Sequence, residues 1–334
     1  MQVPTFHLAA RGDKPHPLPG ATHEGKSLTT HVWIWLAILA ALMQAVRTAA
    51  QKRLTERISI FAATYVRALM GLPVMLAYLG ALRWAGTPLT HPGADFLGWC
   101  VVAAVTQNLG TAALLSLYRR RNFAVANQLA RTNLIFTALL GTAFFSEVIH
   151  AWGWAAIGLT LAGAVMLSAQ HQPVATGMGV RPRWWTQVDA ISVATGLFIG
   201  LMFGLCNLTI REASLSLGAA DAVERGAVTV VAVTGLQVIM LGAWLTWREP
   251  SFMGGIWRTR GLSAFVGVAS AVGSIAWFLA FTLTNASYVI AVGQIEVVFS
   301  VLISWLYFRE RLTRLDLLGI AVVVAGVLLF RLAG

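Results

Sequence analysis

The feature that most constrains the fold is an internal repeat. Residues 122–169 and 285–332 share one plan, in which two apolar stretches are joined by a short polar turn. Four positions match at a constant offset of 163 residues: Gly110 with Gly273, Asn122 with Asn285, Glu147 with Glu310, and Gly163 with Gly326. Because polar and glycine positions rarely keep one register by chance, we predict two copies of one structural unit.

The beginnings of the two copies match at a shorter offset of 158, which pairs Arg53 with Arg211 and Arg67 with Arg225. The change from 158 to 163 indicates a small insertion after the second helix of the later copy. A proline-containing polar tail, expected to be disordered, precedes the first copy. The predicted boundaries are 1–31 for the tail, 32–169 for the first copy, 170–187 for a connector and 188–334 for the second copy.

Composition places the chain in a membrane. Hydrophobic residues make up 57% of it and charged residues 11%, whereas soluble domains carry about 25% charged residues. The mean hydropathy of +0.72 agrees. A membrane-spanning helix needs about 20 mostly apolar residues, and we predict ten, at 32–50, 60–82, 96–118, 122–145, 151–169, 188–210, 219–247, 261–283, 286–308 and 315–332. The net charge of +11 does not indicate nucleic-acid binding, because membrane proteins collect Lys and Arg in their loops.

Ten helices in two copies leave five helices in each copy. Five is odd, so the second copy must enter the membrane from the opposite side. Such inverted repeats are common in secondary transporters, whose cargo site lies near the middle of the membrane between the halves. The predicted fold is therefore an all-α integral membrane protein of ten transmembrane helices in two inverted five-helix repeats.

The usual motifs of catalysis and metal binding are missing. HExxH, CxxC, GxSxG and P-loop patterns do not occur. Cys100 and Cys206 fall in apolar stretches and are expected to be core residues. We therefore predict no enzyme activity, no catalytic residue, no metal and no cofactor. The expected partners are a small-molecule substrate and membrane lipids, with no nucleic acid, and the chain is expected to act as a monomer or homodimer.

Several features in both copies carry a family resemblance. They are the basic end of the first helix, an arginine in the second, a glutamate ending the fourth and glycines in the fifth: Lys52, Arg53 and Arg211; Arg67 and Arg225; Glu147 and Glu310; Gly163, Gly319 and Gly326. In this order they resemble the EamA-type branch of the drug/metabolite transporter superfamily. The resemblance implies two five-helix repeats, a multi-pass location in the bacterial inner membrane and a central cavity lined partly by helices 3, 4, 8 and 9.

The chain departs from that family at one position in each repeat. The family often has a proline thirteen residues before the glutamate of the fourth helix, where this sequence has Leu134 and Val297. Each is preceded by a polar residue, Asn133 or Glu296. The proline-dependent kink of the family therefore cannot be carried over to these positions, and the polar side chains are the candidates to replace the proline.

Charged residues inside membrane helices are costly and are treated as functional candidates. Arg131 and Glu296 lie near the middle of equivalent predicted helices. Two interpretations stay open: the residues pair and lock the halves together, or they contact the cargo. Glu296 is also a candidate for carrying a coupling proton, because burial can hold a carboxyl group in its neutral form.

The other buried charges are assigned weaker roles. Arg67, Arg225 and Glu224 are expected to be structural or cavity charges, and Arg47 is expected to extend toward the nearby membrane surface. Amides concentrate near Arg131, because Asn127 lies one helical turn before it. The predicted substrate-binding residues are Asn108, Asn127, Gln128, Arg131, Asn133, Gln294 and Glu296.

The predicted function follows from these charges. Leaving out the three residues at each end of every predicted helix, four arginines fall in the predicted helices against two acids. Arginine binds carboxylate and phosphate groups through a planar fork. We therefore expect a secondary transporter for a small polar metabolite that is anionic or zwitterionic, such as an amino acid. Export is the direction that we expect, independently of this charge argument. The alternatives are a flippase for lipids or lipid-linked sugars, and a multidrug or cation exporter.

Orientation is a point of conflict within the sequence. In the connectors after helices 1, 3, 5, 7 and 9 there are 14 Lys and Arg, and six lie on the side of the termini when Arg331 at the end of the last helix is counted. The positive-inside rule then places both termini outside. The family resemblance implies cytoplasmic termini.

Overall fold

The structure is a computed structural model that describes residues 31–87, 90, 92–120, 129–170, 190–218, 220–299, 301–302 and 314–333. The predicted tail, apart from residue 31, and the predicted connector, apart from residue 170, lie outside the described residues. The part described is helical, without a strand. The helices are α2 (Val32–Leu54), α3 (Ile60–Trp84), α4 (Ala94–Arg120), α6 (Thr132–Phe144), α7 (Ala151–Gln170), α8 (Ala190–Ser216), α9 (Ala222–Arg248), α10 (Phe252–Arg258), α11 (Arg260–Leu283), α12 (Ala286–Gly293) and α14 (Arg314–Ala333).

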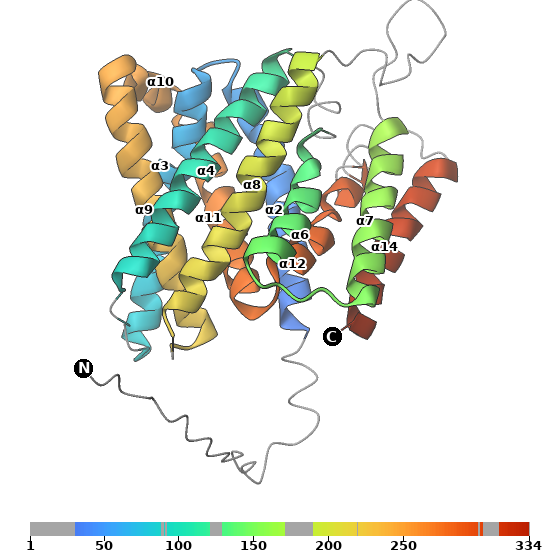
Figure 1. Ribbon diagram of the computed structural model, residues 1–334. Helices are drawn as coiled ribbons and strands as arrows, with labels where there is room; N and C mark the ends of the chain where they lie inside the picture. Colours follow the sequence, from blue (N-terminus) through green and yellow to red (C-terminus); the bar gives the residue numbers. More distant parts are fainter. Residues whose placement is uncertain are drawn as a thin grey trace, which may run out of the picture.

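Six of the described helices are long and apolar enough to cross a membrane: α2, α3, α4, α8, α9 and α11. Shorter apolar helices cover 132–144, 151–167, 286–299 and 317–330. The long helices stand side by side as a bundle in Figure 1. The chain is therefore an all-helical, multi-pass membrane protein.

Several elements differ from the predicted boundaries, among them α2, which ends at Leu54 instead of residue 50. Helix α8 continues to Ser216 instead of ending at residue 210, because its polar last turns find partners, such as Ser214 with the Thr282 hydroxyl at 2.5 Å. The connector after α9 contains the short helix α10, which was not predicted. It forms because it buries Ile256.

Equivalent helices of the two repeats make equivalent contacts. Helix α4 packs on α8, and its counterpart α11 packs on α2. A Cβ atom added at Gly110 would lie 3.3 Å from the Cβ of Met202, and one at Gly273 would lie 3.2 Å from the Cβ of Met43. The matching pair, Met43 and Met202, is 159 residues apart, one more than the offset that the arginines indicated.

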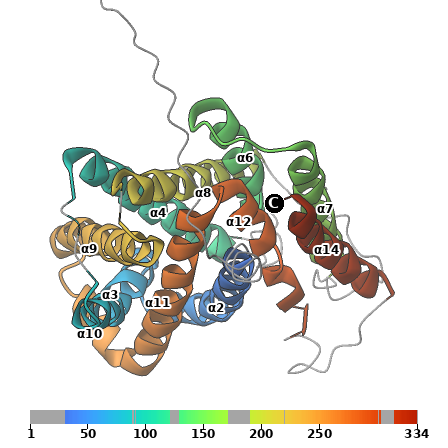
Figure 2. The ribbon, with the colours of Figure 1, turned by 90° about the horizontal axis from the view of Figure 1, so that it is seen from below.

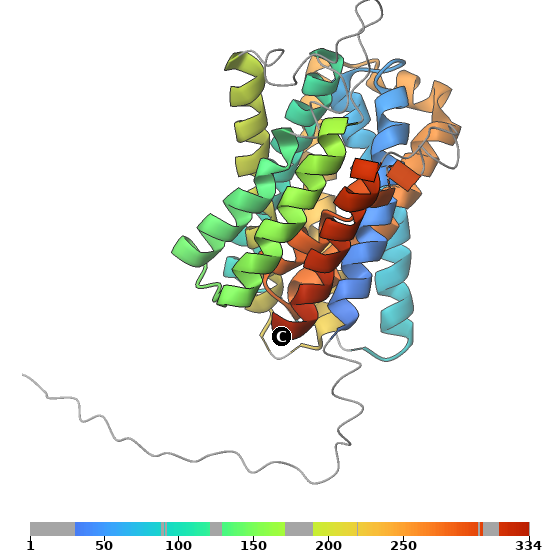
Figure 3. The ribbon, with the colours of Figure 1, turned by 90° about the vertical axis from the view of Figure 1, so that its right-hand side faces the viewer.

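Helices α7 and α14 form the most symmetric contact. A Cβ at Gly163 would lie 2.7 Å from the Val323 nitrogen, and a Cβ at Gly326 would lie 2.8 Å from the Thr160 nitrogen. The two contacts are equivalent, because Gly163 and Gly326 are 163 residues apart and so are Thr160 and Val323. Because Gly163 meets Val323 while the earlier Thr160 meets the later Gly326, the helices run antiparallel. They lie side by side in Figure 3 and stand together at one edge of the bundle in Figure 2.

Aromatic packing attaches this helix pair to the rest of the bundle. The ring of Phe330 on α14 lies 6.1 Å from Trp33 of α2 and 5.1 Å from Tyr288 of α12, measured between centroids. Tyr288 also lies against Gly153 of α7, where an added Cβ would be 2.5 Å from its hydroxyl oxygen. Helix α12 is thus held between α2 and the α7–α14 pair.

The close approach of α7 and α14 predicts that Gly163→Ala destabilises the protein. The new methyl group would meet backbone, which cannot move aside cheaply, so we expect a loss of about 1–3 kcal/mol. Gly158→Ala in the same helix is the control, because nothing lies within 4 Å of its Cβ position. Thermal unfolding in detergent measures both, and equal midpoints for the two variants would contradict the close packing.

Candidate functional site: a polar cavity between the repeats

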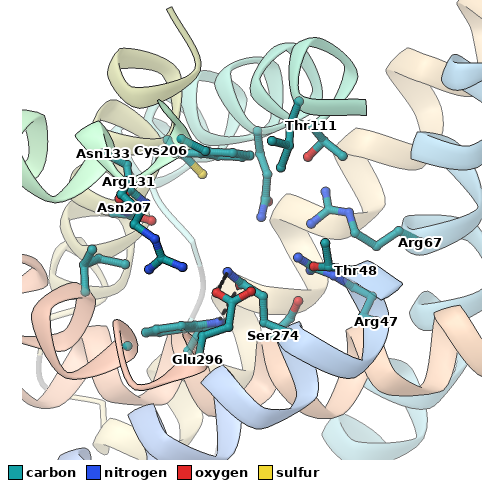
Figure 4. Close-up of a pocket in the computed structure, with 18 of the residues that line it drawn as sticks. Arg47, Thr48, Arg67, Thr111, Arg131, Asn133, Cys206, Asn207, Ser274 and Glu296 are labelled. Atoms are coloured by element: carbon teal, nitrogen blue, oxygen red, sulfur yellow. Dashed lines mark hydrogen bonds between the residues drawn. The ribbon is translucent and has the colours of Figure 1, made fainter. Parts of the chain in front are cut away.

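A cavity of about 130 Å³ lies inside the bundle and is lined from α2, α3, α4, α6, α8, α11 and α12 (Figure 4). An apolar cavity of about 150 Å³ in another protein binds benzene. This cavity is therefore close in size to one that holds a small molecule. Unlike that apolar example, its wall carries charged and amide side chains.

The lining residues come in pairs related by the repeat. Seven pairs are 163 residues apart: Thr111 and Ser274, Leu114 and Trp277, Leu115 and Phe278, Tyr118 and Phe281, Ala130 and Gly293, Arg131 and Gln294, and Asn133 and Glu296. Four more are 159 apart: Gln44 and Phe203, Arg47 and Cys206, Thr48 and Asn207, and Gln51 and Ile210. The cavity therefore lies where the two copies meet.

The fourth helix of each repeat is interrupted beside the cavity. Arg131 has φ −67° and ψ −13°, and its equivalent Gln294 has φ −60° and ψ −15°. Leu134 donates its backbone N–H to the Arg131 carbonyl at 3.1 Å, and Val297 donates to the Gln294 carbonyl at the same distance. These bonds span three residues, as in a 3₁₀ turn. The interruption is thus present in both repeats without the family's proline.

The two interrupted helices contact each other through equivalent residues. The Arg131 guanidinium donates from Nη1 to Gln294 Oε1 at 2.7 Å. The ion pair between Arg131 and Glu296 that the sequence left open does not occur among the described residues. Glu296 instead accepts a hydrogen bond from Gln44 Nε2 at 3.0 Å, and Gln44 Oε1 accepts one from Trp277 Nε1 at 3.3 Å.

A second polar group lines the cavity from α2 and α3. Arg67 donates to Gln237 Oε1 at 3.0 Å, and Gln237 in turn donates to Gln107. Arg47 also lines the cavity, so the expectation that it extends to the membrane surface is wrong. One sequence signal could have found this wall: the polar residues of α2 follow the spacing i, i+3, i+4 and i+7, at Gln44, Arg47, Thr48 and Gln51.

The other predicted site residues take different positions. Asn108 is absent from the cavity lining, and its Oδ1 is buried without a partner among the described residues. Arg225 and Glu224 also lie outside the lining, and Glu224 accepts hydrogen bonds from the backbone and hydroxyl of Thr90 at 2.6 and 2.7 Å. Asn127 and Gln128 lie outside the described residues.

Aromatic side chains also line the cavity, and one of them, Trp277, contacts Gln44 of α2. Trp277 and Phe281 stack with centroids 5.7 Å apart and planes 16° from parallel, and both line the cavity with Tyr118. Cys206 lies in the lining as a free thiol. Among the described residues, no group of His, Cys, Asp and Glu could hold a metal ion.

The segment that carries Gln294 and Glu296 is anchored by a carboxylate of the first repeat. Glu147 is buried and accepts the backbone N–H of Ala286 at 2.6 Å and the hydroxyl of Ser287 at 2.5 Å. A carboxylate at a helix N-terminus is favoured by the helix dipole. Arg211 adds an ion pair with Glu147 at 3.8 Å. Glu147 thus fixes the start of α12 relative to the first repeat.

Two repeats that enclose a polar cavity inside an apolar helical bundle are the arrangement of many secondary transporters. Residues 31–169 and 193–332 match the model of the EamA-like transporter family. The chain belongs to this family, within the drug/metabolite transporter superfamily. No curated protein compared with the chain matches it.

Solved structures agree with this fold. A crystal structure whose chain is 16% identical aligns with 91% of this chain and 96% of its own at a TM-score of 0.63. It is one of 28 chains that match. At this identity the likeness concerns the fold alone.

The anchoring of α12 predicts that Glu147→Gln lowers stability by about 1–3 kcal/mol. The amide keeps the shape but removes a charge-assisted interaction with buried donors and leaves Arg211 without its buried partner. Glu212→Gln is the matched control, since Glu212 lies 3.5 Å from Arg211 but its side chain is 28% exposed, where pairs contribute up to about 1 kcal/mol. Thermal unfolding compares the two variants, and equal losses would contradict the anchoring role.

Proposed function

We propose that the protein is a secondary transporter that exports an anionic or zwitterionic metabolite, such as an amino acid, through the cavity between its repeats. The charge of the cavity wall carries the proposal. Three arginines line it, Arg47, Arg67 and Arg131, against one acid among the described lining residues, Glu296. Guanidinium groups in a low-dielectric site favour a carboxylate-bearing cargo over a cation.

The transmembrane arrangement that we propose is ten helices in two inverted repeats, in a bacterial inner membrane. The four shorter apolar helices then cross the membrane in addition to the six long ones. The antiparallel packing of α7 on α14 supports this arrangement, because equivalent helices of inverted repeats run in opposite directions. We propose that the protein works as a monomer or homodimer, in which each chain forms its own cavity.

The hydrogen bond between Arg131 and Gln294 suggests how cargo is coupled to movement. A cargo carboxylate is a stronger partner for a guanidinium than a neutral amide is. We propose that the carboxylate replaces Gln294 on Arg131 and releases the contact between the two interrupted helices. The breaks at these residues would then allow the helix segments to reorient around the bound cargo.

Glu296 is the proposed carrier of a coupling proton. It is the acid of the described cavity wall, and Gln44 holds one of its carboxylate oxygens. A buried carboxyl group is more readily neutralised than an exposed one. Loss of its charge would weaken the attraction between Glu296 and the arginines and so link proton binding to cargo binding.

Ligand-dependent stabilisation tests the cargo class. We expect a carboxylate-bearing compound from a panel of amino acids, dicarboxylates, sugar phosphates, nucleosides and lipophilic cations to raise the unfolding midpoint of the wild type. Binding to the folded state at 100 times the Kd adds about 2.7 kcal/mol. Arg131→Gln should lose this response. Stabilisation by cations alone, or an unchanged response in the variant, would refute the anionic cargo.

The role of Glu296 is tested by Glu296→Gln in proteoliposomes. The amide imitates the protonated acid and cannot release a proton, so we expect cargo binding to persist while uptake stops responding to an imposed proton gradient. The wild type measured at matched internal and external pH is the control. If the variant keeps its response to the gradient, Glu296 does not carry the proton.

A further inference from the structure

Two arginines lie together in the cavity wall, away from the contact between Arg131 and Gln294. Arg47 comes from α2 and Arg67 from α3, and Figure 4 shows both beside Thr48, across the cavity from Arg131. This pair belongs to the first repeat only. The residue equivalent to Arg47 in the second repeat is Cys206, so the pair is not required by the repeated fold.

The two guanidinium groups have few partners. Arg67 is 4% exposed and donates to Gln237, but its Nε has no acceptor among the described residues. The Nε of Arg47 is likewise buried without an acceptor among the described residues. Each guanidinium presents five N–H donors. Each of the two guanidinium groups therefore keeps at least one N–H donor without an acceptor in the described part of the chain.

The charge near this pair is also unbalanced. Glu296 is the acid of the described cavity wall, and it accepts a hydrogen bond from Gln44. Arg131 adds a third positive charge to the same wall. Three positive charges therefore face one negative charge. Buried charges that lack partners are expensive, whereas a bound oxyanion can accept bidentate bonds from each guanidinium.

We propose that Arg47 and Arg67 form a binding site for an oxyanion, a carboxylate or phosphate group, separate from the group held by Arg131. This inference deepens the proposed function and rests on it for the identity of the cavity as the cargo site. The cargo then carries two anionic groups, one at each end of the cavity. The hydroxyls of Thr48 and Thr111 lie in the same part of the wall and can donate to the oxyanion.

Matched ligand pairs that differ by one anionic group test this site. The pairs are glutamate with glutamine and O-phosphoserine with serine, and inorganic phosphate alone is the third probe. Affinities are measured by thermal shift on the purified wild type. For at least one pair, we expect the acidic member to bind about ten-fold more tightly, as a charge-assisted contact gives.

Variants assign the preference to residues. Arg47→Gln and Arg67→Gln should each remove most of the ten-fold preference. Arg225→Gln is the matched control, because Arg225 is also a membrane-helix arginine with a buried, unpartnered Nε but lies outside the cavity lining. It should keep the preference. If a Gln variant does not fold, the Lys variant keeps the charge without the planar fork and should show a reduced preference.

The results of these experiments distinguish the anion site from the proposed function. Stabilisation by inorganic phosphate that depends on Arg47 and Arg67 and adds to that of a neutral amino acid would identify a separately bound anion as the occupant. Equal binding within both pairs without a phosphate response, or a full preference in the Arg47 and Arg67 variants, would overturn the site. Binding that depends on Arg131 without any charge preference would defeat this inference and leave the proposed function standing. Phosphate binding that depends on Arg47 and Arg67, with no cargo response at Arg131, would support this site and defeat the proposed function.

Discussion

The hydrogen bond from Arg131 to Gln294 is the contact on which the site depends. It joins equivalent positions of the two repeats, and each of the two residues occupies the interruption of its own helix. A buried guanidinium needs acceptors, and Gln294 supplies one from the other repeat. The same contact closes the cavity wall between α6 and α12. The arrangement therefore links the symmetry of the fold, the break in the helices and the position of the site.

Equivalent residues of the two repeats are alike where helix backbones approach closely, and they differ where they line the cavity. Glycines keep their equivalents at the close helix contacts, as at Gly163 and Gly326. The cavity-lining pairs have diverged: Arg131 faces Gln294, and Arg47 has Cys206 as its equivalent. Both copies of the repeated unit need small residues at their close contacts. The two copies share one cavity, however, so equivalent residues that line it need not be alike. Each copy can therefore contribute a different half of the wall, here a polar face from α2 and an aromatic face from α11.

The repeat, the membrane class and the family were accessible from the sequence, because a constant offset and apolar helices depend on local pattern. The cavity was only partly accessible. Helix 4 was singled out by its cluster of amides and Arg131, whereas Arg47 was assigned to the membrane surface from its distance to the helix end. Distance along a helix does not report which side faces a cavity. The partner of Arg131 was also beyond the sequence, because the break at Gln294 and Ile295 changes which side chains of that segment face α6.

A double-mutant cycle on Arg131→Gln and Gln294→Ala measures the contact at the junction most directly. The unfolding free energies of the wild type, both single variants and the double variant are compared in the same detergent. A direct hydrogen bond to a charged group predicts that the double variant loses less than the sum of the single losses, with a coupling of about 1.5–3 kcal/mol. Additive losses would show that the two residues do not interact and would contradict a site built on their contact.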